Sequence, residues 1–475
     1  MNFYMYLWMF IIFLDLLSIL SLVFIERRDT TTTWAWLLII FLFPILGFIL
    51  YLIFGQNISK EKIFNQKASI DKAKIKNMIN YINNDYEDSI TKYKDLIKLN
   101  LNTNSSIYST NNKIKTYING EDKFKDLIND IENATHFIHI EYYIFRLDSI
   151  GKRIIEILKR KVSEGVIVRI LIDGMGSSSI KKKEINSIRK SGINISIFFP
   201  SIFHYLNLRI NYRNHRKIVV IDNKIGYIGG FNVGNEYINK GEKFSFWRDT
   251  HIRIYGEAVL ELNKRFSLDW EYAAKESIDY KRYFSINKFE HKNNIGIQII
   301  SSGPDNLEEY IRNTYIKIIS LAKKNIYIQT PYLVLDEPMI TSLKIAASSG
   351  VDVRIMVPNN PDHFFMAWAL SASISSLISS GVKFYKYTKG FIHSKTIVSD
   401  SHIYSVGTAN FDIRSFKLNF EINALIYDIK FAKLQESIFI NDERDCIILC
   451  KNDFENRSTK IKILESLSNL IFPIL

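Results

Sequence analysis

Two long apolar stretches dominate the N-terminal part of the chain. The first runs over residues 3–25 and is interrupted only by Asp15 and two serines, and the second runs over residues 34–54 without a charged residue. At a helical rise of about 1.5 Å per residue, both are long enough to cross a hydrocarbon layer about 30 Å thick. A secretory signal peptide fits less well, because the first stretch lacks a basic leader and a second span follows at once. We therefore expect two transmembrane helices within residues 1–55.

The charges that flank these stretches predict their orientation. The loop between them carries two arginines beside two acidic residues, whereas several lysines follow the second stretch, namely Lys60, Lys62, Lys67, Lys72 and Lys74. Basic residues accumulate on the cytoplasmic side of membrane proteins, so we expect a multi-pass protein whose long C-terminal part is cytoplasmic. Asp15 lies inside the first span, where it is either a functional residue or a neutral carboxyl packed against the second helix.

Residues 56–112 change to a composition rich in Lys, Asn and Ile. Apolar residues recur at steps of three and four from Ile75 to Ile97, which is the spacing of an amphipathic helix. That helix either lies on lipid headgroups or packs against the folded domain. Residues 102–112, rich in Asn, Ser and Thr, are typical of a linker. We expect an amphipathic helical linker over residues 56–112.

The remainder of the chain repeats one pattern of strands and helices. In each half, an apolar strand precedes a helix, a Gly-Val turn and a second strand. The expected strands cover residues 137–145 and 168–172, and again 326–334 and 353–357. Alternation of this kind is typical of helices that cover a largely parallel or mixed sheet. We expect two similar α/β domains, over residues 113–288 and 289–475.

The composition limits the classes of partner and the cellular compartment that fit this chain. The chain has 475 residues, of which 47% are apolar, so it contains ample material for a core. Its formal net charge of +13 favours anionic partners, either nucleic acid or the negatively charged face of a bilayer. Cys446 and Cys450 are too few for a disulfide framework and lack the further spacing of a zinc site. We expect them to be helical packing residues in a reducing compartment.

One polar motif occurs twice. The pattern H-x-K-x(4)-D is found once in each half, and an asparagine follows each histidine at the same spacing. The offset between the two copies is constant, and the members are His215, Lys217, Asp222 and Asn232 in the first half and His393, Lys395, Asp400 and Asn410 in the second. One such triplet arises by chance in roughly one chain in twenty of this length, but two copies with shared flanking residues are strong evidence of a functional site.

These residue types suit chemistry at a phosphodiester. His215 and Lys217 are two residues apart on an apolar strand, so their side chains point to the same face and can reach one anion. Two histidines supply a nucleophile and a proton donor, while lysines and asparagines supply donors for the phosphate oxygens. A shared anion would push the two histidine pKa values apart, so that a neutral and a cationic copy coexist. A metal site explains the pattern less well, since lysine is not a usual metal ligand.

The duplicated motif resembles that of the phospholipase D superfamily, and the chain is similar over essentially its whole length to the bacterial cardiolipin synthases of that superfamily. Supporting segments are E-R-R-D at 26–29, T-W-A-W at 33–36, H-I-E-Y-Y-I-F at 139–145, N-H-R-K at 214–217, I-G-G-F-N at 228–232, W-R-D-T-H at 247–251, S-S-G-P at 301–304 and Y-I-Q-T-P-Y at 327–332. The apolar hairpin separates the chain from soluble lipases and nucleases. Asp29 and Thr30 depart from an expected proline-containing loop, which affects the turn and not the chemistry.

The resemblance implies two phospholipase D-like domains related by pseudo-two-fold symmetry, and a phosphatidyl transfer that uses neither metal nor other cofactor. His215 would attack the phosphorus of one phosphatidylglycerol while His393 protonates the departing glycerol. His393 would then deprotonate the terminal hydroxyl of a second phosphatidylglycerol, giving cardiolipin. The side chains implied to hold the phosphate are those of Lys217, Lys395, Asn232 and Asn410.

The resemblance also implies a role for two further carboxylates. A carboxylate downstream of each motif would orient its histidine, and the residues that match are Asp249 in the first half and Glu421 in the second. The third members of the motifs, Asp222 and Asp400, are expected to brace their strands or lysines rather than touch phosphorus.

Two other functions stay open at this point. A membrane-anchored phospholipase D that uses water shares every catalytic residue and differs only in its acceptor. A non-catalytic lipid-binding protein is disfavoured by two intact motifs. The expected partners are phosphatidylglycerol and anionic lipids of the bacterial cell membrane, and nucleic acid is not expected.

Overall fold

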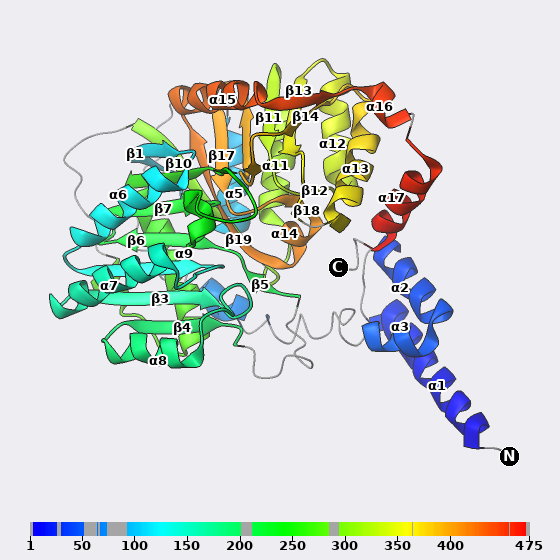
Figure 1. The fold of residues 1–475 in the computed structure, drawn as a ribbon, viewed down its shortest axis with the longest axis horizontal. Coiled ribbons are helices and arrows are strands. Elements are labelled where there is room, and N and C mark those ends of the chain that lie inside the picture. The colour runs from blue at the N-terminus through cyan, green and yellow to red at the C-terminus, as the bar shows by residue number, and fades with distance from the viewer. Residues whose placement is uncertain are drawn as a thin grey trace.

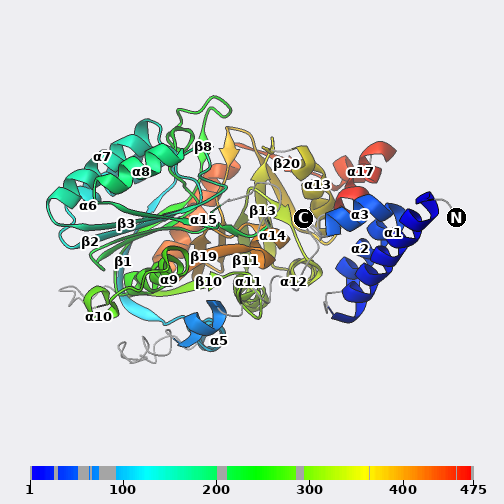
Figure 2. The ribbon, with the colours of Figure 1, turned by 90° about the horizontal axis from the view of Figure 1, so that it is seen from below.

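A computed structural model of the chain describes residues 3–25, 30–51, 64, 67–73, 93–200, 211–284, 294–362, 364–455 and 457–471. Figure 1 shows a large α/β body with the apolar N-terminal helices standing at one side of it. The same separation is visible from below in Figure 2, where α6, α7 and α8 cover one side of the first-half strands and α9 covers the other.

The N-terminal helices differ from the expected hairpin. Helix α1 (Phe3–Leu20) continues as a π-helical turn, η1 (Ser21–Ile25), and residues 3–24 form the one described helix that is long and apolar enough to cross a membrane. The second stretch is not one continuous helix, because α2 (Thr30–Leu42) ends before Pro44, which begins α3 (Pro44–Leu50). Proline has no backbone N–H and its ring clashes with the preceding turn, so it interrupts a helix.

Close packing holds these short helices together. A Cβ on Gly47 of α3 would lie 2.6 Å from the carbonyl oxygen of Ile39 in α2, so only glycine permits this approach. Asp15 is 9% exposed, and its Oδ1 has no hydrogen-bond partner among the described residues. This burial fits the packed interpretation of Asp15. The loop arginines and Lys60, Lys62 and Lys74, which predicted the orientation, lie outside the described residues.

The segment between the N-terminal helices and the α/β body is described only in part, and residues 74–92 lie outside the description. Helix α5 (Lys94–Asn104) buries Leu96 and Ile97, which favours packing on the body over a headgroup surface. The expected linker at residues 102–112 is wrong at both ends, because α5 continues to Asn104 and strand β1 (Ser109–Tyr117) begins inside it. Asn112 explains the difference: it is fully buried, and its side chain hydrogen-bonds the backbone of neighbouring elements in place of solvent.

The body is built on one large sheet, of 16 strands among the described residues. The first-half strands are β1, β2 (Phe137–Tyr142), β3 (Ile167–Asp173), β4 (Asn194–Phe198), β6 (Lys217–Ile221), β7 (Ile225–Gly229) and β9 (His251–Gly256). The second-half strands are β10 (Asn294–Ser302), β11 (Asn325–Gln329), β13 (Asp352–Pro358), β14 (Lys383–Tyr387), β16 (Thr396–Ser399), β17 (Ile403–Gly407), β19 (Asn419–Tyr427) and β20 (Cys446–Leu449). Short strands are β5 (Arg213–Asn214), β8 (Trp247–Arg248), β12 (Leu333–Val334), β15 (Phe391–Ile392) and β18 (Phe411–Asp412).

Helices cover both faces of this sheet. In the first half these are α6 (Gly120–Glu132), α7 (Ser149–Ser163), α8 (Lys182–Lys190), η4 (Asn235–Ile238), α9 (Ala258–Ala274) and α10 (Tyr280–Tyr283). In the second half they are α11 (Tyr310–Leu321), α12 (Glu337–Ser348), α13 (Phe364–Ile378), α14 (Ile413–Lys417), α15 (Ile429–Glu443), α16 (Lys451–Glu455) and α17 (Thr459–Ile471).

The strand order confirms the duplication. From the centre outwards the first half reads β1-β9-β7-β6-β2-β3-β4 and the second reads β10-β19-β17-β16-β11-β13-β14, with β1 and β10 antiparallel at the join. Equivalent turns have nearly equal backbone angles, with φ of 88° at Gly165 and 90° at Gly350. One apolar core draws residues from both halves, including Ile218 and Phe420. The halves are therefore continuous through sheet and core.

The cysteines depart from the sequence prediction. Cys446 begins strand β20, which pairs antiparallel with β14, and Cys450 follows that strand, so neither is a helical packing residue. Neither cysteine forms a disulfide with the other. The run Cys-Ile-Ile-Leu forms a short strand because β14 offers it an open sheet edge, which a local apolar pattern cannot reveal.

Candidate active site

Backbone pairing across the two halves positions both histidines. Strand β5, just before His215, pairs in parallel with β19 of the second half, so that Asn214 lies beside Phe420. Strand β15, just before His393, pairs in parallel with β8 of the first half, so that Ile392 lies beside Arg248. One residue beyond each of these strand pairs, His215 lies beside Glu421 and His393 lies beside Asp249.

Each imidazole contacts a carboxylate from the opposite half. The Nδ1 atom of His215 lies 2.9 and 3.0 Å from the two carboxylate oxygens of Glu421. The Nδ1 atom of His393 lies 2.7 Å from Oδ2 of Asp249. We expected each carboxylate to orient the histidine of its own motif, and that pairing is wrong. The physical reason is the parallel register of β5 with β19 and of β15 with β8, which exchanges the partners between halves.

Burial sets the charge of the two histidines. It lowers the pKa of His215 to about 4, an effect that Glu421 opposes and Lys217 reinforces. Burial, together with the ammonium of Lys395, also lowers the pKa of His393 to about 4, against the pull of Asp249. Because a carboxylate can only accept, each neutral imidazole donates its Nδ1–H to the carboxylate. The lone pair of each Nε2 atom is thereby available for nucleophilic attack or proton uptake.

Two fully buried lysines complete the cluster. Lys217 Nζ donates to the carbonyl oxygen of His215 at 2.7 Å, and Lys395 Nζ donates to that of His393. Lys395 Nζ also lies 2.9 Å from Nδ1 of His393, but that nitrogen cannot accept a hydrogen bond while its own proton is donated to Asp249. Burial lowers the pKa of Lys217 to about 7 and that of Lys395 to about 8.

Electrostatic coupling joins the two motifs into one site. The charge of Lys395 contributes to lowering the pKa of His215, and the charge of Lys217 contributes to lowering that of His393. The pKa of Glu421 falls below its usual value despite its burial, because His215 and Lys217 stabilise the carboxylate. Such mutual effects require the members of both motifs to lie near one another.

The two asparagines lie close to this chemistry in the fold but are not alike. Asn232 and Asn410 follow β7 and β17, the strands that neighbour the motif strands. Asn232 donates to the hydroxyl of Tyr237 at 3.0 Å and accepts from the amide of Ile144 at 3.2 Å. Asn410 is 5% exposed, and its Oδ1 has no hydrogen-bond partner within the described part of the chain. The carboxamide of Asn232 is therefore engaged within its own half, whereas the oxygen of Asn410 is not.

The third motif members serve the fold. Asp222 accepts from the amides of Thr135, His136 and Phe137 at 2.7–2.8 Å, where β2 begins. Asp400 accepts from the amides of residues 323–325, where β11 begins. The extended chain that separates each from its histidine spans about 20 Å. The bracing role expected for both agrees with these contacts, which lie at the far end of each motif from its histidine.

Two aromatic residues at the site were missed by sequence reasoning. The ring of Tyr143 lies 4.9 Å from the imidazole of His215, and the ring of Trp247 lies 5.2 Å from that of His393. Both belong to segments that support the family resemblance, H-I-E-Y-Y-I-F and W-R-D-T-H. Their position in those segments was the available signal, but only the fold reveals which ring contacts which histidine.

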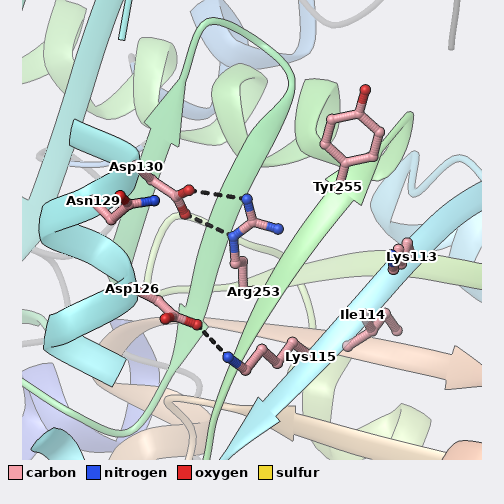
Figure 3. A pocket seen from close by; sticks show the side chains of 8 residues that line it. All are labelled: Lys113, Ile114, Lys115, Asp126, Asn129, Asp130, Arg253 and Tyr255. Carbon is pink, nitrogen blue, oxygen red and sulfur yellow. Dashed lines mark hydrogen bonds and ion pairs between the residues drawn. The ribbon is translucent and has the colours of Figure 1, made fainter. Parts of the chain in front are cut away.

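A cavity of about 680 Å³ lies away from the histidines, between α6, β1 and β9 (Figure 3). Four of its five charged side chains form ion pairs: Arg253 contacts both carboxylate oxygens of Asp130 at 2.7 and 3.0 Å, and Lys115 pairs with Asp126. Because these charges are already paired and none of the motif residues lines the cavity, we do not assign it to the reaction.

Comparison with known proteins identifies the family. A family model described as "Cardiolipin synthase, PLD-like domain" matches residues 127–270 and 315–443, and a "Phospholipase_D-nuclease N-terminal" model matches residues 13–56. A cardiolipin synthase of Clostridium perfringens (strain 13) is 50% identical over 457 residues, covering 95% of this chain and 96% of the relative. A cardiolipin synthase of Staphylococcus aureus (strain Mu50) is 47% identical, covering 97% of this chain and 95% of the relative.

A solved structure supports the fold. The phosphatidylserine synthase of Haemophilus influenzae Rd KW20 aligns with a TM-score of 0.59 at 15% identity, over 80% of this chain and 100% of that protein. The family model covers more than half of the chain, and the two relatives match nearly all of it. The chain therefore belongs to the cardiolipin synthase family with phospholipase D-like domains.

Proposed function

We propose that this protein is a cardiolipin synthase that transfers a phosphatidyl group between two phosphatidylglycerol molecules through a phosphohistidine. The observation that carries the mechanism is the pair of crossed contacts, His215 with Glu421 and His393 with Asp249. They hold two neutral imidazoles with unprotonated Nε2 atoms beside two buried lysines. A phosphoryl transfer needs this combination of nucleophile, proton carrier and fixed positive charge.

In the first half-reaction, Nε2 of His215 forms a bond to the phosphorus of one phosphatidylglycerol. The bond between phosphorus and the headgroup glycerol oxygen breaks, and His393 gives that oxygen its Nε2 proton. His393 must therefore be protonated when substrate is bound, and the negative phosphate beside it raises its pKa for this purpose. Lys217, Lys395 and the asparagines stabilise the charge that develops on the phosphate oxygens.

In the second half-reaction, free glycerol has left and His393 is neutral. It removes the proton from the terminal hydroxyl of a second phosphatidylglycerol, whose oxygen then bonds to phosphorus. The bond between phosphorus and Nε2 of His215 breaks, which gives cardiolipin and restores both histidines. Water competes with the lipid hydroxyl at this step, so a site that excludes water favours synthesis over hydrolysis.

The anchor suits substrates that stay in a bilayer. We place α1 across the bacterial cell membrane and the α/β body on its cytoplasmic side, where the headgroups of anionic lipids lie. A second crossing by α2 and α3 would make the protein multi-pass, although the break at Pro44 gives that segment a different shape from α1. The net charge of +13 supports binding to an anionic surface.

Product analysis tests this function. The purified full chain in detergent micelles containing phosphatidylglycerol should release glycerol and form cardiolipin in equal amounts. Phosphatidic acid as the main product would show that water is the acceptor and that the protein is a phospholipase D. Binding of the lipid without any product would revive the non-catalytic interpretation.

A further inference from the structure

A short segment between the membrane anchor and the body inserts behind the active site. It consists of Phe64 and the helical residues 67–73, which we call the juxtamembrane wedge. Phe64 is 2% exposed, and its ring lies 5.0 Å from that of Tyr212 and 5.5 Å from that of Phe420. Tyr212 belongs to the first half and Phe420 to the second, so the wedge contacts both.

The wedge contributes two charges to a buried ion cluster. Lys67 is 2% exposed, and its Nζ lies 2.6 Å from Asp71, 2.8 Å from Asp305 and 3.5 Å from Asp269. The sequence pattern counted Lys67 among the lysines that predict the orientation, and the structure places it inside the body instead of at its surface. Burial and the nearby Arg265 oppose a charge on Lys67, yet the three carboxylates together raise its pKa.

Arginines balance the rest of the cluster. Arg265 contacts Asp71 at 3.0 Å and Asp269 at 2.8 Å, and Arg216 pairs with Asp269. The described members are thus three cations and three carboxylates, with no excess charge. A buried ion that loses its partner is strongly destabilised, so the removal of Lys67 would force the remaining side chains to rearrange.

Arg216 connects this cluster to the catalytic pair. It follows His215 directly, its Nε donates to the carbonyl oxygen of Glu421 at 3.2 Å, and its guanidinium lies 5.2 Å from the ring of Phe420. The carbonyl oxygen of Phe420 accepts from the amide of His215 at 3.0 Å. Lys67 Nζ lies 5.6 Å from the same ring. A shift of Arg216 or Phe420 would therefore move His215 and Glu421 relative to each other.

We propose that Lys67 and Asp71 are positioning residues, which act through Arg216 and Phe420 to hold the contact between His215 and Glu421. The segment that leaves the membrane anchor is then part of the support of the active site and not a passive tether. This inference rests on the proposed role of His215 as the nucleophile.

Single-turnover labelling of the full chain tests the proposal. Phosphatidylglycerol with a labelled phosphate should give a covalent phosphatidyl-enzyme, whose amplitude reports the fraction of folded enzyme and whose rate constant reports the chemistry. We expect Lys67→Met to lower the rate constant by roughly 10- to 100-fold with little loss of amplitude, because small misplacements of reacting groups have effects of that size. The variant Lys67→Met with Asp305→Asn, which restores the charge balance, should recover most of the rate constant.

A matched control separates positioning from general stability. Lys264 is also a buried lysine paired with a carboxylate, Glu261, and lies on α9 beside Arg265, but none of its hydrogen bonds leads to His215. Lys264→Met should leave the rate constant unchanged. A wild-type rate constant in Lys67→Met, with or without lower amplitude, would overturn the proposal.

Two further outcomes are decisive. If Lys67→Met gives no folded protein, Asp71→Asn is measured in its place, because that change alters the charge of the wedge and keeps its shape. A wild-type rate constant in Asp71→Asn would then overturn the proposal. Wild-type enzyme that makes cardiolipin without any labelled histidine would instead overturn the proposed mechanism, and this inference with it.

Discussion

The two halves of the body share a strand order and a motif, yet their histidines have different surroundings. His215 contacts both carboxylate oxygens of Glu421, and its lysine donates to the backbone carbonyl of His215. His393 contacts one oxygen of Asp249 and has the ammonium of Lys395 2.9 Å from its ring. Duplication therefore produced one site with two unequal positions, and the fixed register between the halves made each half depend on a carboxylate of the other.

Removal of either imidazole should have the largest effect and should distinguish the two positions. His215→Ala and His393→Ala are each expected to lower cardiolipin synthesis by roughly 10⁵-fold, since groups that act as a unit fail together. With a p-nitrophenyl phosphodiester, whose leaving group needs no proton, His393→Ala should still release a burst of p-nitrophenol and His215→Ala should not. His136→Ala, at an exposed histidine, is the control and should resemble wild type. The opposite burst pattern would make His393 the nucleophile.

The next largest loss of activity is expected when one of the crossed carboxylates, Glu421 or Asp249, is replaced. Glu421→Gln and Asp249→Asn should each lower kcat by about 10³-fold, because the tautomer and the orientation of one imidazole are lost. The p-nitrophenyl substrate should relieve the loss in Asp249→Asn, whose histidine carries the proton, and not in Glu421→Gln. Relief in Glu421→Gln alone, in an enzyme whose bursts identify His215 as the nucleophile, would indicate that each carboxylate serves the histidine of its own half. The variant Asp126→Asn, at a half-buried carboxylate away from the histidines, serves as the control.

The lysines should give a smaller loss and a pH dependence. Lys217→Met and Lys395→Met are expected to lower kcat/KM by about 10²-fold, the size found when one donor to a developing oxyanion is removed. In the wild type, kcat/KM should fall as pH rises because His393 must carry a proton, and it should fall more steeply through about 7 to 8 because the lysine ammonium groups lose their charge above their pKa values. A profile that stays flat to about pH 9.5 would contradict a role for these charges.

The smallest catalytic effect is expected at the third motif members. Asp222→Asn and Asp400→Asn should lower the free energy of unfolding by about 1–3 kcal/mol, since each variant weakens several hydrogen bonds to backbone amides. The kcat of the folded fraction should stay within about twofold of wild type, because these carboxylates lie about 20 Å along the chain from the histidines. Thermal unfolding and initial rates on the same preparations measure both quantities. A large loss of kcat with unchanged stability would show that the whole motif is catalytic.

Much of this architecture was predictable from the sequence because it depends on residues that are close together in the chain. Apolar runs predicted β2, β3, β11 and β13, and the constant offset between the motifs predicted the duplication. The crossing of the carboxylates was not predictable, because it depends on the register of β5 with β19, two strands that lie in opposite halves of the chain. The break at Pro44 was visible in the sequence, but the uninterrupted apolar run outweighed it.

The burial of Lys67 shows a different limit. It is one of several lysines that follow the second apolar stretch, so it resembles an exposed juxtamembrane lysine. Its three carboxylate partners are Asp71, Asp269 and Asp305. Only the fold brings these together. The same holds for Tyr143 and Trp247, whose contacts with the histidines join segments far apart in the chain.

The central claim is that His215 and His393 flank a single phosphate, and an experimental structure with a bound phosphate analogue such as vanadate tests it most directly. The account predicts one anion between the halves, with the Nε2 atoms of both histidines within bonding or hydrogen-bonding distance of it and Glu421 and Asp249 on the Nδ1 sides. Two anions in separate clefts, each contacted by one histidine, would contradict it.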